Sequence, residues 1–216
     1  MTIEKKRLET TAERLEYVTI GWNVFEMLIT IALGIASRSL ALVAFGLDTM
    51  VELFASGVVV WHLRHAGRDT GRVTAKALRL VAASFEVLAV VVAAGAIWAL
   101  VTRSAPDESP IGVVVIAITV FVMLALGLAK RTAGRQLGSE PVLAEARMSI
   151  LDAALAFGVL LGLAANAAVG WWWADPIAAI LVAIAALNET RENREEARKL
   201  EEMESDPRPE TTIERS

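Results

Sequence analysis

The chain has 216 residues, of which 55% are hydrophobic and 21% charged, and its net charge is −4. Soluble domains are usually less apolar, at about 45–50%, and carry about a quarter of charged residues. Cysteine is absent, which excludes disulfides, thiolate metal sites and thiol catalysis. The sequence shows neither a nucleotide-binding loop nor a strand pattern, and we expect no nucleic-acid partner.

Long stretches of the chain carry no charge, notably residues 109–129 and 153–174. About 20 apolar residues in a helix cross the ~30 Å hydrocarbon core of a bilayer. The sequence therefore predicts an integral membrane protein embedded in a lipid bilayer. The first 16 residues are polar and lack the features of a cleavable signal peptide, so the first apolar segment is expected to remain as a span.

The apolar segments predict an all-α fold, a bundle of six transmembrane helices. Their expected ranges are 17–36, 39–63, 77–102, 110–130, 143–168 and 171–188. Three consecutive tryptophans at 171–173 suit the headgroup layer at one end of the bundle.

Charged segments flank this transmembrane domain, which we place at residues 17–188. Residues 1–16 are expected to form a charged N-terminal cytoplasmic helix, and residues 189–216 a charged cytoplasmic helical tail that ends in disorder from residue 205 onward. The many Glu and Arg residues at helical spacing in both segments are most simply solvated surfaces.

The basic residues set the orientation. Of the 21 lysines and arginines, all but Arg38 and Arg103 fall before the first span, in the second and fourth linkers, or in the tail. The positive-inside rule then places both termini in the cytoplasm. Such an arrangement requires an even number of spans, and six is even, so two independent arguments agree.

Six acidic residues lie within the predicted spans, although each costs at least a few kcal/mol at the bilayer centre if it stays ionised and unpaired. They are Glu26, Asp48, Glu52, Glu86, Asp152 and Asp175. No lysine or arginine lies deep in any predicted span to neutralise them. The compensating charge is therefore expected to come from protons or from a cation that enters from outside the chain.

Asp48 and Glu52 lie one helical turn apart, about 40° around the helix axis, and so face the same way. Asp48 is ~14 Å from the start of its span, near the middle of the membrane. Two like charges this close resist joint ionisation unless a cation lies between them. A hydrogen-bonded pair that fixes helix packing is the alternative; we favour a cation site.

The fifth predicted helix supplies a third acid, Asp152, which shares one face with Met148 and Glu145. Glu145 lies close to the cytoplasmic boundary, where it is either a solvated acid at the helix start or a cytoplasmic-side ligand. Met148 is either a core side chain or a thioether ligand, and a thioether would favour a transition metal over calcium or magnesium.

Other polar or small residues have simpler interpretations. Glu26 shares a stripe with Asn23 and Thr30. These residues could line the cavity beside the site, or Glu26 could act as a proton carrier. Asp175 is expected to cap the sixth helix at the outer interface. Gly158 and the glycine four residues later lie on a face away from Asp152, which suits close helix contact.

Three segments together resemble the cation diffusion facilitator (cation efflux) family, in particular its small bacterial members that lack the soluble C-terminal domain. They are SLALVAFGLDTMVELFASG, EARMSILDAALAFGVLLG and GWWWADPIAAILVAI, and the likeness extends over about residues 17–195. The family's fold is a six-helix transmembrane domain. Its members export Zn²⁺ and related divalent ions from the cytoplasm, usually in exchange for protons.

The resemblance also implies a ligand set. In the family, a His/Asp-x-x-x-Asp pair and a His-x-x-x-Asp pair form a tetrahedral metal site at mid-membrane. Asp48 and Glu52 match the first pair, Asp152 matches the second acid, and Met148 stands where the family has histidine. This departure leaves the metal open among Zn²⁺, Mn²⁺, Fe²⁺, Co²⁺ and Cd²⁺. A homodimer would form through the transmembrane helices alone.

These observations predict a secondary active transporter of the bacterial inner (plasma) membrane. It would export a zinc-like divalent transition-metal cation by proton antiport. The metal ion is the transported substrate, protons are the expected counter-ion, and no permanently bound cofactor is expected. The alternative is a non-transporting membrane scaffold or metal sensor that retains the transporter fold. We do not expect an enzyme, because the acids lack the polar neighbours with which an intramembrane hydrolase would organise a peptide.

Overall fold

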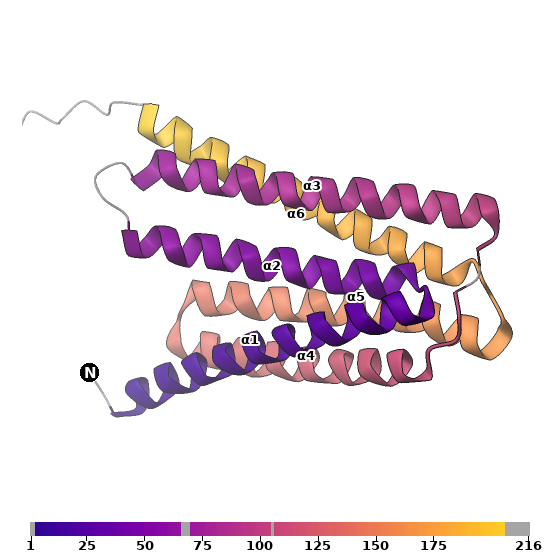
Figure 1. Cartoon of the computed structure of the whole chain (residues 1–216). Coiled ribbons are helices and arrows are strands. Elements are labelled where there is room, and N and C mark those ends of the chain that lie inside the picture. The colour runs from indigo at the N-terminus through magenta and orange to yellow at the C-terminus, as the bar shows by residue number, and fades with distance from the viewer. Residues whose placement is uncertain (1–2, 66–69, 105, 206–216) are drawn as a thin grey trace, which may run out of the picture.

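The computed structural model describes residues 3–65, 70–104 and 106–205, and these form an all-α bundle (Figure 1). Its helices are α1 (Ile3–Ser37), α2 (Leu40–His65), α3 (Thr70–Thr102), α4 (Pro110–Leu137), α5 (Glu140–Val169) and α6 (Ala174–Ser205). The predicted six-helix, all-α fold is confirmed. The predicted disorder of the C-terminal residues falls almost wholly on 206–216, which lie outside the described residues.

The helices run roughly along one direction, and α1 begins at the end of the bundle where α6 ends (Figure 1). Helix α3 packs along α6, and α4 packs along α5. Helix α2 contacts α1, α3 and α6, while α1 also contacts α4. This arrangement places α1, α2 and α5 around the middle of the bundle, where four of the six intramembrane acids lie.

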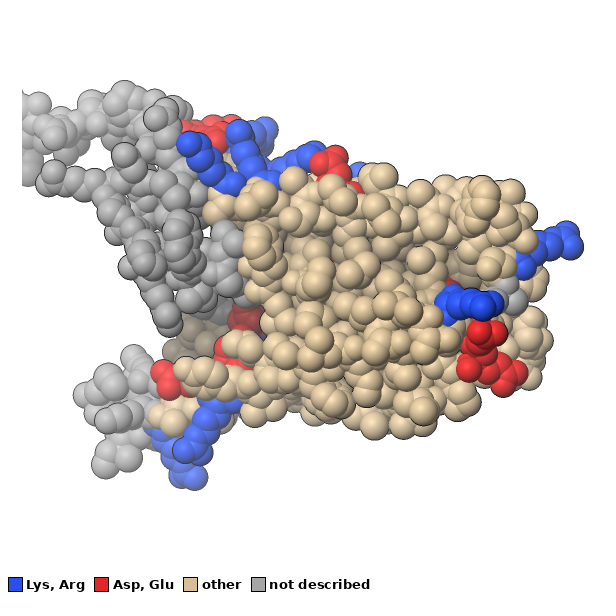
Figure 2. Space-filling model, in the orientation of Figure 1, with Lys and Arg blue, Asp and Glu red and all other residues tan. Residues whose placement is uncertain are grey.

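On the face shown in Figure 2, charged side chains gather toward the two ends of the bundle, and uncharged side chains cover the broad band between them, here called the apolar belt. Within the described residues, four helical segments are long and apolar enough to cross a membrane. They are Thr10–Ser37, Ala75–Thr102, Pro110–Leu137 and Glu145–Val169. Large apolar side chains point outward along them, such as Leu28, Trp98 and Phe121, which are 62%, 71% and 74% exposed. Outward apolar surface of this extent suits contact with lipid.

Two helices extend further than the predicted spans. Helix α3 begins at Thr70 and α4 continues to Leu137, so much of the two basic linkers is helical. Beyond the apolar belt, water solvates the basic side chains, and lysine and arginine are good helix formers. Helix α4 starts at Pro110 as predicted, where the Ser109 hydroxyl accepts a hydrogen bond from the Gly112 amide. It ends at Leu137 and is followed by Gly138, which has a φ of 62°.

The charged end of α6 packs against the start of α3. Ala75, Leu78 and Ala197 form a small buried cluster there, with Leu200 against it. Ion pairs flank this cluster: Arg79 Nη2 lies 2.6 Å from Glu201 Oε2, and Arg194 pairs with Glu86. The expectation that the helical tail presents only a solvated surface is therefore wrong for one of its faces, because that face buries apolar side chains.

Small residues bring α5 and α6 close together. A Cβ atom at Gly162 would lie 2.7 Å from Ala178 Cβ and 3.0 Å from the Ala174 carbonyl oxygen, and one at Gly158 would lie 3.1 Å from Leu181 Cδ1. Such short distances leave no room for a larger side chain. The predicted helix contact on this face of α5 is confirmed.

Asp175 caps a different helix from the one expected. Its carboxylate accepts hydrogen bonds from the Ser39 hydroxyl, from the Leu40 amide at 2.9 Å and from the Ala41 amide at 3.3 Å. Those groups form the N-terminus of α2, whose amides lack partners within the helix. The sequence suggested a cap of α6 because Asp175 lies in its first turn, but the start of α2 is nearby in space. Asp175 thereby joins α6 to α2.

Candidate functional site

Four of the intramembrane acids surround one small cavity in the middle of the bundle. Its lining residues are Asn23, Glu26, Phe45, Asp48, Thr49, Glu52, Met123, Asp152 and Leu155. The acids come from three helices: one from α1, two from α2 and one from α5. The structure thus brings the predicted site residues Asp48, Glu52 and Asp152 together and adds Glu26.

The close approach of α1 to α2 places Glu26 beside the α2 acids. At the crossing, a Cβ atom on Gly46 would lie 2.6 Å from Thr30 Oγ1 and 3.1 Å from the Ile31 amide nitrogen. Glu26 lies one turn before Thr30 on α1, on nearly the same face of the helix, and it lines the same cavity as Asp48 and Glu52 of α2. The glycine at this position allows the cavity to be shared between the two helices.

Two of the cavity carboxylates each have one oxygen without a hydrogen-bond donor among the described residues. Glu26 is 2% exposed and Asp48 is 5% exposed. Glu26 Oε1 and Asp48 Oδ1 are buried and have no hydrogen-bond partner among the residues that the structure describes. The Thr30 hydroxyl does not serve them, because it donates to the Glu26 backbone carbonyl at 2.7 Å. Buried oxygens without donors are costly, and a proton or a cation would relieve that cost.

The cavity is small, with a volume of about 10 Å³, which is room for one water molecule or a single ion. In this conformation, no group of three Asp, Glu or His side chains in the described part of the chain converges closely enough to hold a metal ion. The acids therefore line a common space without closing around its centre.

Met148 and Glu145 are not among the residues that line the cavity. Met148 is half-buried one turn before Asp152 on α5. Glu145 lies two turns before Asp152, and its Oε2 is 3.8 Å from the Nζ atom of Lys130. Their suggested roles as metal ligands remain predictions.

Lys130 is a buried cation that sequence reasoning missed. It is 1% exposed, and its Nζ lies 2.8 Å from Glu16 Oε2, so that α4 is linked to both α1 and α5 through the two glutamates. The lysine follows the apolar run of α4 and was grouped with the cytoplasmic basic residues. One signal in the sequence could have indicated its burial. Lys130 lies on the same face of the helix as Met123 and Leu126, which are also buried.

Two other charged contacts modify the expectations. Glu86 pairs with Arg194 of α6, so the expectation that no basic residue neutralises an acid within the predicted spans is wrong at this position. Glu189, also on α6, lies close enough to Asp48, Glu52 and Asp152 to repel each of them electrostatically. Sequence reasoning missed Glu189 because it lies just beyond the last predicted span.

The comparisons with known proteins identify the family. The family model of the cation efflux transmembrane domain matches residues 17–198, a range that contains all the residues of the cavity. A search of curated proteins found no match. The family consists of transporters rather than enzymes, which agrees with a membrane-spanning bundle that encloses acids. The chain belongs to the cation efflux family and is an integral membrane protein with the fold of its transmembrane domain.

Proposed function

We propose that the protein is a secondary active transporter that exports a divalent transition-metal cation from the cytoplasm in exchange for protons. Family membership supports the transport of metal cations in general. The divalent charge, the zinc-like chemistry and the proton coupling are proposals that rest on the residues of the cavity.

The observation that carries the proposal is the concentration of Glu26, Asp48, Glu52 and Asp152 around one small cavity inside the apolar belt. Four carboxylates cannot all stay ionised in such a place without compensating positive charge. The paired cation Lys130 is engaged with Glu16 and Glu145, outside the cavity lining. A divalent cation and protons are two ways to supply the missing charge, and they compete for the same oxygens.

That competition gives the transport cycle. Carboxylates must lose their protons before they bind a metal, so binding the metal releases protons. With the cavity open to the cytoplasm, deprotonated Asp48, Glu52 and Asp152 hold the ion. With the cavity open to the outside, protons displace it, and the protonated acids then carry the neutralised site back. The proton gradient across the membrane drives net export.

The choice of metal depends on the fourth ligand. Oxygen ligands alone suit Mn²⁺ and similar ions, while a thioether from Met148 would shift the preference toward softer transition metals. Zinc would bind less tightly than at a site with histidine, because imidazole is a stronger zinc ligand than thioether. We therefore propose Zn²⁺, Mn²⁺, Fe²⁺, Co²⁺ and Cd²⁺ as the ions to compare.

We further propose that the protein lies in the bacterial inner membrane with both termini in the cytoplasm. The shared location of the start of α1 and the end of α6 supports termini on one side (Figure 1). The excess of basic residues at that end supports the cytoplasmic assignment. Any homodimer is proposed to form through the transmembrane helices.

Metal uptake into inverted vesicles, with an imposed pH gradient, tests this function. The wild-type protein is expected to accumulate metal only when the gradient is present, and a pH-sensitive dye should report a matching proton flux. Asp48→Asn and Asp152→Asn remove a charge with little change in shape, so each is expected to abolish both fluxes. Isothermal titration with the metal panel at two pH values measures binding separately.

A matched control is Glu86→Gln on α3, which removes an acid outside the cavity and is expected to leave transport near the wild-type level. Unchanged flux in Asp48→Asn and Asp152→Asn would show that the site is wrong. Metal binding without flux in the wild-type protein would instead favour a sensor or scaffold. That second candidate rests on the position of Met148, outside the cavity lining and in the place of the family's histidine.

A further inference from the structure

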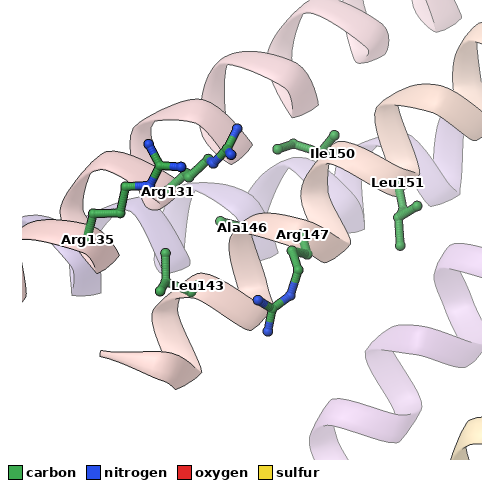
Figure 3. Close-up of a pocket in the computed structure, with 7 residues that line it drawn as sticks. All are labelled: Arg131, Arg135, Leu143, Ala146, Arg147, Ile150 and Leu151. Carbon is green, nitrogen blue, oxygen red and sulfur yellow. The ribbon is translucent and has the colours of Figure 1, made fainter. Parts of the chain in front are cut away.

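A second cavity lies between α4 and α5, at the end of the bundle where α4 ends and α5 begins (Figure 3). It has a volume of about 500 Å³ and combines basic and apolar residues in its lining, namely Arg131, Arg135, Leu143, Ala146, Arg147, Ile150 and Leu151. The volume is in the range of small-molecule sites. None of these residues lines the small cavity that the four intramembrane acids share.

The packing of α4 on α5 directs the arginines outward. A Cβ atom on Gly127 would lie 2.7 Å from Ile150 Cγ1, and one on Gly134 would lie 2.9 Å from Leu143 Cδ2. These two glycines therefore mark the contact stripe of α4. Arg131 and Arg135 follow Gly127 by about 40° and 80° around the axis, on one flank of the stripe.

Lys130 lies on the opposite flank of the stripe, about 60° before Gly127, and there it is buried against α1. The close helix contact thus separates neighbouring basic residues of α4. Lys130 is buried and pairs with Glu16 and Glu145, whereas Arg131 and Arg135 are exposed and face outward.

Among the described residues, no acidic side chain pairs with any of the three arginines. Arg131 and Arg135 project from α4 and Arg147 from α5, and Leu143, Ala146 and Ile150 line the same cavity (Figure 3). Like charges gathered without acidic partners repel one another, so an anion bound among them would be stabilised.

We propose that this cavity binds the headgroup of an anionic phospholipid from the surrounding leaflet. Guanidinium groups form paired hydrogen bonds with phosphate oxygens. Ile150 and Leu151 line the cavity beside the arginines, and Leu151 is 60% exposed, so an acyl chain can continue from the headgroup along α5. Basic pockets between helices at the membrane surface are suited to this ligand class.

Two other occupants fit the cavity less well. A soluble phosphate would satisfy the arginines but leave the apolar lining uncovered. A second copy of the chain, docked around a twofold axis at this face, would bring the same three arginines toward one another, which opposes association. An anionic lipid satisfies the charge and the apolar surface together.

Native mass spectrometry of the detergent-purified full chain tests the proposal, with phosphatidylglycerol and phosphatidylcholine as the titrated lipids. The wild-type protein is expected to bind phosphatidylglycerol in preference. The triple variant Arg131→Gln/Arg135→Gln/Arg147→Gln is expected to bind it about 100-fold more weakly, because each basic residue near a membrane surface contributes roughly fivefold. Leu151→Ser should weaken lipid binding several-fold.

The matched control is Arg14→Gln/Arg191→Gln/Lys199→Gln, which removes three exposed positive charges at the same end of the bundle. It is expected to keep phosphatidylglycerol binding within about threefold of wild type. Equal losses in both triple variants would overturn the proposal, because the effect would then come from net charge alone. Unchanged binding in the arginine variant would overturn it as well.

Two further arms identify the ligand if the glutamine variant folds poorly. The variant with lysine at all three arginine positions keeps the charge and is expected to retain lipid binding within about tenfold, still in preference to phosphatidylcholine. The soluble headgroup glycerophosphoglycerol is expected to compete only at far higher concentration than the lipid. Competition at equal concentration would show a soluble-anion site, and a change of oligomeric state without lipid loss would show a subunit interface; either result overturns the lipid assignment.

Discussion

Replacing Asp175 should loosen the start of α2, the helix that carries two acids of the cavity. The Asp175 carboxylate accepts from the Ser39 hydroxyl and from the amides of Leu40 and Ala41, and the residue is only 1% exposed. Asp175→Ala leaves these three donors without their acceptor. It also removes a negative charge from the positive end of the α2 dipole.

The magnitude follows from those contacts. Loss of a helix cap costs about 0.5–2 kcal/mol, and loss of a partly buried charge at a helix N-terminus costs up to ~2 kcal/mol. These contributions overlap, since the cap bonds are themselves charge-assisted, so the expected loss is about 3 kcal/mol for Asp175→Ala. Asp175→Asn keeps one acceptor oxygen and the shape of the side chain, and it is expected to lose about half as much.

Reversible unfolding of the purified protein in mixed micelles, followed by circular dichroism, measures this loss as a change in the free energy of unfolding. Asp107→Asn is the matched control, because Asp107 is an exposed acid in the loop before α4, and it should change stability by less than about 0.5 kcal/mol. Ser39→Ala and Asp175→Ala should also combine non-additively, because they share a hydrogen bond. A loss below about 1 kcal/mol for Asp175→Ala would refute the capping argument.

Three other substitutions test the surroundings of the cavity. Gly46→Ala should destabilise the protein by about 1–3 kcal/mol, because its Cβ would be 2.6 Å from Thr30 Oγ1. Gly21→Ala is the control: its Cβ would have no neighbour within 4 Å, so it should be neutral or stabilising in the same unfolding assay. Lys130→Met should cost about 2 kcal/mol, less than a fully buried pair, because its partners are 41% and 54% exposed; no loss would mean that the ion pairs contribute little. Glu26→Gln should reduce the pH dependence of metal affinity measured by isothermal titration, and an unchanged dependence would exclude Glu26 from the proton-coupled step.

Much of the fold was predictable because each span is long, apolar and bounded by local signals. Pro110 marks the start of α4, and the glycines of α5 mark its contact with α6, since both are features of a single segment. The extra length of α3 and α4 was not predicted. Charged residues beyond an apolar run are compatible with both a loop and a solvated helix, and the packing of Ala75 on Ala197 involves partners far apart in sequence.

The candidate site was predictable only in part for the same reason. Asp48 and Glu52 share a face by local geometry alone, and an acid such as Asp152 in an apolar helix is conspicuous in the sequence. The roles of Lys130 and Asp175 depend on which helix lies opposite. Asp175 has a suitable position to cap its own helix, yet the start of α2 presents three donors to it.

These tertiary contacts divide the six intramembrane acids into two groups, and the division strengthens the case for a transported cation. Glu86 is neutralised by Arg194, and Asp175 by the N-terminus of α2, so neither requires a ligand from outside the chain. The four acids left are the ones that share the cavity. They are the charges that the described chain leaves without matched partners, and their gathering at one place in the apolar belt is explained by a positive ion that comes and goes.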